Sequence, residues 1–134
     1  MFPASTKAGG MCMGIPDVCL TPAGPSPVPI PYPNIAQVSN ASGTIDKVKI
    51  GNKETVVESS KISSSSGDEA GTTGGVISGV NRDQCTWKSS SSKVYAGNKK
   101  VVMLTAMTAH NGSSPNCPVG LQMTPSQTSV IVFP

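Results

Sequence analysis

The chain has 134 residues, of which 13% are charged and 4% aromatic, and its formal net charge is +3. This is the length of one domain. No apolar run approaches the roughly 18 residues of a membrane-spanning helix, and the N-terminus lacks the pattern of a secretory signal peptide. The basic residues form no cluster with interleaved aromatic side chains, so no nucleic-acid partner is expected. Abundant Ser, Gly and Pro, with short groups of Val and Ile, predict a small all-β domain whose thin core needs a metal ion, a disulfide or a partner.

A proline-rich segment lies near the N-terminus. Residues 16–33 contain seven of the twelve prolines, and the last five of these alternate with other residues. Proline fixes φ, lacks a backbone N–H and pushes the preceding residue into an extended conformation. We therefore predict an extended arm that is not a central strand of a sheet. Val28, Ile30 and Tyr32 alternate with the prolines, which favours an arm packed on its own domain over a rigid linker or a ligand for another protein's groove.

An internal repeat follows the arm. Residues 47–57 and 93–103 each contain an apolar strand, a Gly-Asn pair, a lysine and a second apolar strand. Because Gly-Asn tolerates positive φ at both central positions of a tight turn, each copy predicts a β-hairpin. Residues 128–133 predict a closing strand, and the serine runs 63–66 and 89–92 predict exposed loops. Three strand units without a helical period indicate a compact, roughly threefold β structure.

The residues that could carry chemistry are one histidine, His110, four cysteines and seven carboxylates. The cysteines are Cys12, Cys19, Cys85 and Cys117, and the carboxylates are Asp17, Asp46, Glu54, Glu58, Asp68, Glu69 and Asp83. The cysteines have three interpretations, namely disulfides, ligands of a structural metal, or inert buried thiols. The missing signal-peptide pattern disfavours disulfides, and the spacing is not that of a zinc finger. His110 and Cys117 share a loop rich in Gly, Pro and Asn that could fold around a metal ion. A hydrolytic Cys–His pair is an open alternative.

Several motifs are specific enough to indicate a family. Gly-Gly-Met at residues 9–11 precedes Pro-Asp-Val-Cys-Leu-Thr-Pro at 16–22 and Pro-Val-Pro-Ile-Pro-Tyr-Pro-Asn-Ile at 27–35. Near the C-terminus, Asn-Cys-Pro-Val-Gly at 116–120 precedes Pro-Ser-Gln-Thr-Ser-Val-Ile-Val at 125–132. Together these motifs resemble the PAAR-like domain family of type VI secretion, and the resemblance covers nearly the whole chain.

The resemblance implies a small conical β structure that caps the trimeric spike of a contractile injection machine, with a zinc ion held by cysteine and histidine near its tip. Cys19 and Cys117 match cysteines of the family's motifs, and Cys85 precedes the second hairpin, where relatives often have a histidine. Relatives also often place a histidine after the first hairpin turn, and this chain has none there. We therefore assign His110 as the fourth ligand, with Cys12 as the alternative for that place.

The expectation is thus a single metal-stabilised domain over residues 1–134, with the N-terminal segment and proline-rich arm at 1–35 and the hairpin repeats and closing strand at 36–134. We expect a non-enzymatic spike tip that aids membrane puncture and effector delivery. Its partners would be a trimeric spike protein with one tip per trimer, a non-covalently loaded effector and, transiently, the target membrane. It would reside in the bacterial cytoplasm until it is exported at the spike tip. The alternative function is a proline-rich adaptor module that recruits a partner domain.

Overall fold

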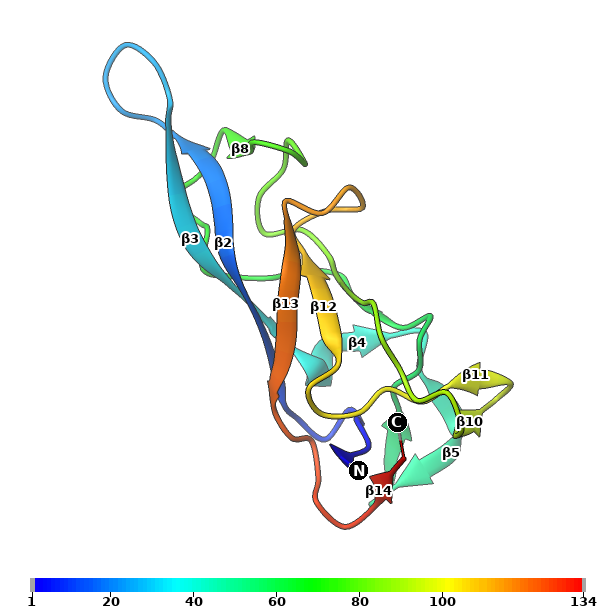
Figure 1. The fold of residues 1–134 in the computed structure, drawn as a ribbon. Coiled ribbons are helices and arrows are strands. Elements are labelled where there is room, and N and C mark those ends of the chain that lie inside the picture. The colour runs from blue at the N-terminus through cyan, green and yellow to red at the C-terminus, as the bar shows by residue number, and fades with distance from the viewer. Residues whose placement is uncertain (1, 134) are drawn as a thin grey trace.

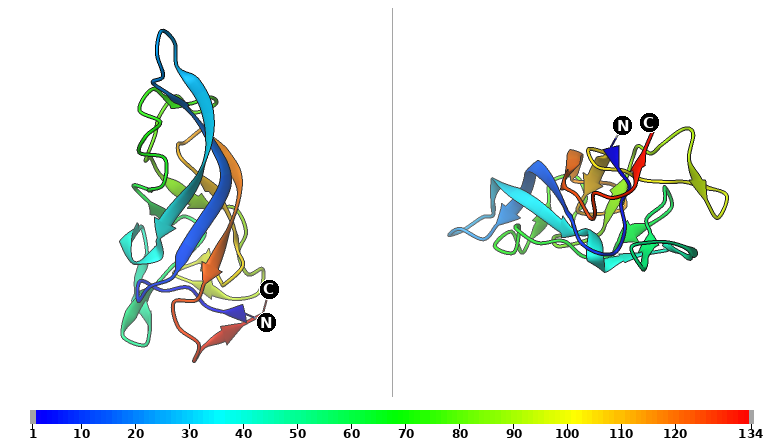
Figure 2. Two further views of the ribbon diagram at one scale, coloured as in Figure 1. Left: turned by 90° about the vertical axis from the view of Figure 1, so that its left-hand side faces the viewer. Right: turned by 90° about the horizontal axis from the view of Figure 1, so that it is seen from below.

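The computed structural model describes residues 2–133, which form fourteen short and long strands, one 3-10 turn (η1, Val38–Asn40) and no α-helix. The prediction of an all-β fold is therefore confirmed. The molecule is elongated, with both termini at a broad end and the turn between β2 and β3 at a narrow end (Figures 1 and 2). Across the described residues, no helix is long and apolar enough to span a lipid bilayer.

The largest sheet has eight antiparallel strands, seven of which lie in the order β3-β2-β13-β12-β9-β7-β4, while β8 pairs with β2. Their bounds are β2 Met11–Thr21, β3 Val28–Gln37, β4 Ala41–Ser42, β7 Lys61–Ile62, β8 Gly74–Gly75, β9 Cys85–Trp87, β12 Met107–His110 and β13 Cys117–Thr124. Three separate antiparallel pairs lie at the broad end (Figure 1). They are β1 Phe2–Pro3 with β14 Ile131–Val132, β5 Ile45–Ile50 with β6 Lys53–Thr55, and β10 Tyr95–Ala96 with β11 Lys99–Lys100.

Both predicted hairpins are present, and their turns have the expected backbone. The φ angles are 59° at Gly51 and 65° at Asn52, and 57° at Gly97 and 64° at Asn98. Positive φ at both central residues gives the turn a twist that matches the flanking strands. The predicted closing strand is also present as β14, which pairs with β1. These local features therefore follow directly from the residue types in the turns.

The proline-rich arm is extended, and its second part, β3, lies at the edge of the large sheet, as predicted. Residues 16–21 belong instead to β2, which pairs with β3 on one side and with β8 on the other, so the prediction that the arm is not a central strand is wrong for this part. β3 pairs with β2 along its length, with Cys19 opposite Ile30 and Leu20 opposite Pro29. On its other side β2 accepts hydrogen bonds from Thr73 and Val76, through the carbonyls of residues 20 and 18. Since successive residues of a strand bond to opposite sides, residues 17, 19 and 21 bond to the non-proline residues of β3. The prolines therefore occupy the outward positions, where no N–H is needed.

The serine runs are loops, but each contains one buried residue. Ser65 donates a hydrogen bond to the carbonyl of Asp83 and accepts one from Asn34. Ser91 donates to the carbonyl of Phe133 and accepts from the backbone N–H groups of residues 93 and 94. The prediction of exposed loops is therefore wrong for these two hydroxyl groups, because each closes a loop by bonding to backbone groups.

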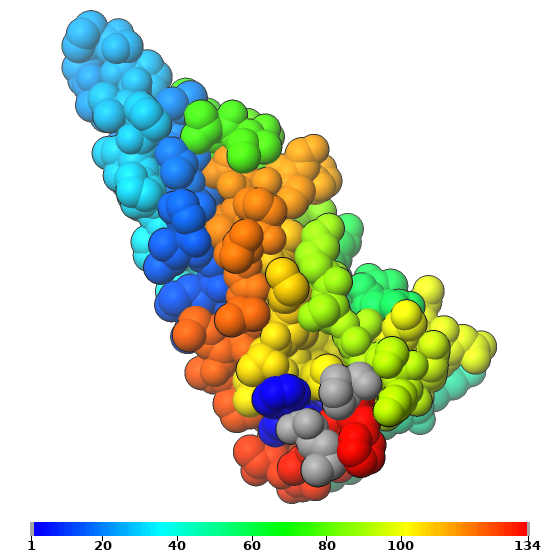
Figure 3. Space-filling view, in the orientation of Figure 1, coloured from blue at the N-terminus to red at the C-terminus, as the bar shows by residue number. Residues whose placement is uncertain are grey.

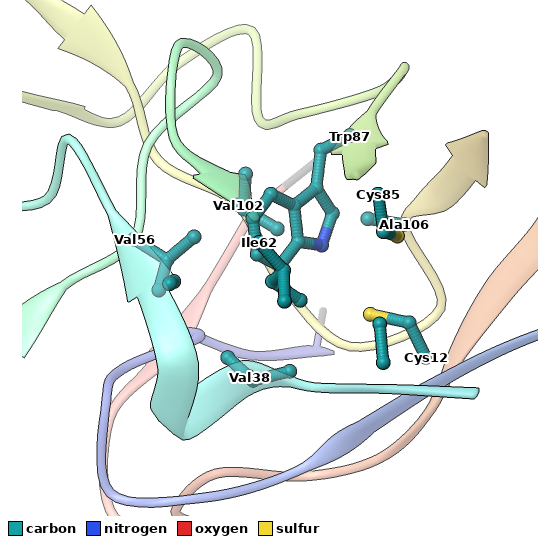
Figure 4. Packing of buried hydrophobic residues seen from close by; sticks show 10 residues of the cluster. Cys12, Val38, Val56, Ile62, Cys85, Trp87, Val102 and Ala106 are labelled. Carbon is teal, nitrogen blue, oxygen red and sulfur yellow. The ribbon is translucent and has the colours of Figure 1, made fainter. Parts of the chain in front are cut away.

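Two clusters of buried apolar side chains form the interior. The larger contains Trp87 (Figure 4), and its members are Cys12, Ala36, Val38, Ala41, Val56, Ile62, Cys85, Trp87, Val102 and Ala106. The smaller lies where the three strand pairs meet, and its members are Ala4, Val57, Ala96, Val101 and Val132. Most of these side chains are small, so the interior is thin and polar groups fill part of it.

Candidate metal centre

The single histidine is buried at the end of a strand, beside two cysteines. His110 closes β12 and lies opposite Cys117, the first residue of β13. Its Nε2 is 3.8 Å from Sγ of Cys85, which begins β9, and 2.8 Å from Oγ1 of Thr108. All four side chains are buried. The sheet order β13-β12-β9 thus brings together three of the predicted ligands, from positions far apart in the sequence.

Two glycines make room for this group. Gly14 of β2 and Gly120 of β13 lie opposite each other in the sheet. A Cβ on Gly14 would lie 2.7 Å from Sγ of Cys117 and 2.8 Å from Cδ2 of His110, and a Cβ on Gly120 would lie 2.7 Å from Nε2 of His110. These separations are shorter than real Cβ contacts, so the imidazole ring fits only if both positions are glycine, which has no side-chain carbon.

The tautomer of His110 follows from its partner, Asn34. The amide nitrogen of Asn34 donates to Asp17 (3.0 Å), Ser65 (2.9 Å) and Asp68 (3.4 Å). Its amide oxygen therefore faces Nδ1 of His110, 2.7 Å away, and accepts a hydrogen bond from it. Nε2 is then unprotonated and presents its lone pair to Cys85 and Thr108. Burial, opposed by the charge of Asp17, lowers the pKa of His110 to about 4, so the ring is neutral near pH 7.

Cys12 is the fourth member of this neighbourhood. It lies on β2 in the same buried cluster as Cys85 (Figure 4). A hydrogen bond with Cys12, burial, and the charges that Cys12 and Cys117 would carry all raise the pKa of Cys85. Burial also raises the pKa of Cys117. The thiols of Cys85 and Cys117 are therefore protonated at neutral pH unless a cation compensates their charge.

Cys19 lies in a second buried cluster, with two aspartates. Ligand atoms of Asp17, Cys19 and Asp68 all lie within 4.8 Å of one another, so this group could hold a metal ion. Sγ of Cys19 is 3.5 Å from Oδ1 of Asp17 and 3.8 Å from Oδ2 of Asp68. Asn111 and Asn116 donate to Asp17, and the backbone N–H of residue 82 donates to Asp68.

The two carboxyl groups of this cluster differ in acidity. Burial raises the pKa of Asp17, but hydrogen bonds from Asp68, Asn116, Asn111 and Cys19 outweigh it, and the pKa lies below its ordinary value. Burial and the hydrogen bond with Asp17 raise the pKa of Asp68 to about 6. Burial and the charge of Asp17 raise the pKa of Cys19 to about 12. The pair therefore shares a proton, with Asp17 as the ionised member.

The structure thus distributes the predicted ligands over two clusters. Cys85, His110 and Cys117 lie together, and Cys19 lies with the two aspartates on the other side of Asn34. Sequence reasoning did not assign a role to Asp17, Asn34 or Asp68. Asp17 and Asn34 belong to the Pro-Asp-Val-Cys and Pro-Tyr-Pro-Asn motifs, which carry the resemblance to the family. Nothing in the sequence around Asp68 distinguishes it from a loop residue.

The fold and its buried clusters define a small all-β domain in which cysteine, histidine, carboxylate and amide side chains occupy the interior. The family model of the toxin PAAR-like domain matches residues 10–118, and the chain belongs to this family. The resemblance of the sequence motifs is therefore confirmed, and it associates the chain with the spike of a type VI secretion system. No curated protein and no solved structure matches the chain.

Proposed function

We propose that this chain is a non-enzymatic tip that caps and sharpens the trimeric spike of a type VI or related contractile secretion system. Its family membership and its tapering all-β shape support this function (Figure 3). The broad end would seat on the spike, and the narrow β2–β3 end would lead during membrane puncture. The protein would wait in the bacterial cytoplasm and leave it with the spike.

The arrangement of the broad end carries this proposal. Its three strand units are joined in a ring by single β-bridges, Val57 to Val101, Met103 to Ala4, and Thr6 to Thr55. Each unit therefore contacts the other two. Such a ring of three units suits a surface that binds a threefold-symmetric partner. Val132 of β14 faces the smaller core cluster. Its neighbours Ile131 and Phe133, 53% and 56% exposed, offer apolar surface to a partner at this end.

A matched pair of variants tests whether the broad end binds the trimeric spike. Ile131→Asp places a charge at the broad end, and Val119→Asp places one on β13, where Val119 is 64% exposed. Ile131→Asp should abolish co-purification with the trimeric spike protein, while Val119→Asp should bind it like the wild type. Equal binding by both variants would contradict the proposed orientation.

We further propose that one zinc ion stabilises the domain, held by Cys85, His110, Cys117 and Cys12. The donor types suit zinc, and the 3.8 Å between Nε2 of His110 and Sγ of Cys85 is less than the sum of a zinc–imidazole and a zinc–thiolate bond, about 2.0 and 2.3 Å. Among the described residues, no three of these four ligand atoms lie within 4.8 Å of one another, so the side chains would have to draw together around the ion. Cys12 takes the fourth place in preference to Cys19, since Asp17 and Asp68 already engage Cys19. The ion would compensate the thiolate charges and tie β2, β9, β12 and β13 together.

Metal analysis of single-cysteine variants tests this ligand set. The wild type should contain about one zinc ion per chain. Cys12→Ser should lose the ion, and Cys19→Ser, the matched control, should keep it. The reverse pattern would assign the ion to the cluster of Asp17, Cys19 and Asp68, and freely reactive thiols without zinc would overturn the metal centre altogether.

The buried position of the Cys–His pair supports a role without catalysis. Neither Cys85 nor His110 is exposed, and the pKa of Cys85 is raised, chiefly by its hydrogen bond with Cys12. A nucleophilic cysteine needs the opposite, a lowered pKa and access for substrate. His110→Ala should therefore release metal and destabilise the fold. Loss of a specific turnover with metal and fold intact would favour an enzyme.

Effector loading has a candidate surface on one side of the molecule. Two adjoining hollows, each of about 320 Å³, share Ile15 and Val119. Their lining carries no charged side chain, and Val76 and Ile77 are 55% and 67% exposed at its edge. We propose that an apolar segment of an effector binds here without a covalent link. Val119→Asp should then release the effector and leave spike binding intact.

The alternative adaptor function depends on a free proline arm. β3 is instead paired with β2 from Val28 to Gln37, so its backbone is engaged within its own sheet. Deleting residues 22–33 should therefore unfold the protein. An intact fold that only loses a partner would favour the adaptor.

A further inference from the structure

Trp87 has a buried hydrogen-bond donor without an acceptor. Its side chain is 5% exposed, and Nε1 is the only buried side-chain nitrogen or oxygen in residues 2–133 that lacks a partner. Leaving such a group unpaired in a protein interior is costly, and native structures rarely do so. The indole therefore indicates an acceptor that the protein gains in its functional state.

The position of the ring identifies that acceptor. The indole nitrogen lies on the side of the ring that faces Cys12 and Cys85 (Figure 4), and all three residues belong to one buried cluster. A neutral thiol is only a weak acceptor. A thiolate is a strong one, since hydrogen bonds to ionised groups are shorter and about twice as strong as neutral ones. A cysteine sulfur bound to a metal ion is a thiolate, so the pair would supply a good acceptor when it coordinates a cation.

We propose that the indole N–H of Trp87 donates a hydrogen bond to a metal-bound thiolate of the Cys12–Cys85 pair and positions it for coordination. This inference rests on the zinc centre proposed above. Trp87 does not touch the ion. It orients a ligand from outside, as the partners of metal-bound side chains commonly do. The same bond satisfies the one orphan donor, so metal loading completes the hydrogen bonding of the core.

The chain offers a direct readout, because Trp87 is its only tryptophan and gives one indole N–H resonance in a nitrogen-15 NMR spectrum. On loading with cadmium-113, this proton should shift downfield, exchange more slowly with solvent and show scalar coupling to the metal through sulfur. A bound metal with an unmoved, uncoupled indole resonance would overturn this inference alone. Failure to bind any metal would overturn both this inference and the zinc centre.

A pair of variants separates the hydrogen bond from packing. Trp87→Phe keeps an aromatic ring but removes the N–H, and it should weaken cobalt(II) binding about 10-fold and shift the sulfur-to-cobalt charge-transfer band. Ile62→Val, in the same cluster, perturbs packing only and should leave both unchanged. Equal cobalt affinity and spectra for Trp87→Phe and the wild type would contradict the proposal, provided that thermal unfolding shows both variants to be folded.

Discussion

The imidazole of His110 donates through Nδ1 to the side-chain oxygen of Asn34, 2.7 Å away, and both residues are fully buried. The amide group of Asn34 also binds Asp17 and Asp68, so this one side chain joins the two buried clusters. Its orientation fixes the histidine tautomer and leaves Nε2 unprotonated, so that this nitrogen accepts a hydrogen bond from Thr108 and could instead bind a metal ion.

Replacing Asn34 should therefore weaken the metal centre. Asn34→Ala removes the acceptor for His110 and should reduce zinc affinity about 10- to 100-fold, measured by competition with a chromophoric chelator. Asn34→Asp keeps an acceptor for His110 but replaces the amide donors with a third carboxyl group beside Asp17 and Asp68. Compared with Asn34→Ala, it should therefore lower the unfolding free energy more and the zinc affinity less. Asn40→Ala, at an exposed position, is the control. Wild-type affinity in Asn34→Ala would exclude the proposed role.

The space beside Gly14 should be equally critical. Gly14→Ala places a methyl group against Cys117 and His110, and such overpacking should cost about 1–3 kcal/mol of unfolding free energy and prevent zinc uptake. Ser39→Ala, at an exposed position, is the control. Denaturant unfolding and metal content distinguish the two variants, and full zinc uptake by Gly14→Ala would argue against a centre at this place.

Asp68 should make stability depend on pH in the direction opposite to most carboxyl groups. Its folded-state pKa is raised from 3.8 to about 6, mainly by burial. The folded protein therefore binds this proton more tightly than the unfolded chain. The resulting stability is fully present below about pH 4 and is lost as the pH rises through about 6.

Asp68→Asn mimics the protonated carboxyl group and cannot lose its proton. In metal-free protein, the variant should gain on the order of 2 kcal/mol relative to the wild type between pH 4 and pH 8. Urea unfolding at several pH values measures this difference, with Asp46→Asn on the exposed side of β5 as control. A difference that does not change with pH, or changes in the opposite direction, would show that Asp68 is ionised in the folded state across this range.

The outward prolines of β3 should prevent edge-to-edge association. Replacing Pro29 and Pro31 with Val restores two N–H groups at an open sheet edge. We expect the double variant to remain folded but to self-associate with rising concentration in sedimentation velocity. The same replacements at Pro25 and Pro27, in the turn before β3, should leave a monomer. A monomeric β3 variant would show that the prolines serve the backbone conformation alone.

Features set by neighbouring residues could be predicted from the sequence. The Gly-Asn pairs at 51–52 and 97–98 fix their own turns, and the alternating prolines of β3 can be nothing but extended. The first half of β2, residues 11–15, was not predicted as a strand, because it contains two glycine-flanked methionines without alternation and becomes a strand through pairing with β3 and β13. Such long-range pairing overrides local preference.

The candidate site was predictable only in part, for the same reason. His110 and Cys117 are close in sequence and meet across one hairpin. Cys85 joins them through the sheet, whereas Cys19 lies beside Asp17 and Asp68. Asn34 and Asp68 carry roles that only the three-dimensional contacts reveal.

The stoichiometry of the complex with a trimeric spike protein tests the spike-tip function most directly. Co-expression followed by native mass spectrometry should give one copy of this chain per three spike chains, since the ring of three strand units offers a single seat to a threefold partner. Three copies per trimer, or no complex with the spike of a type VI system, would contradict the proposed tip.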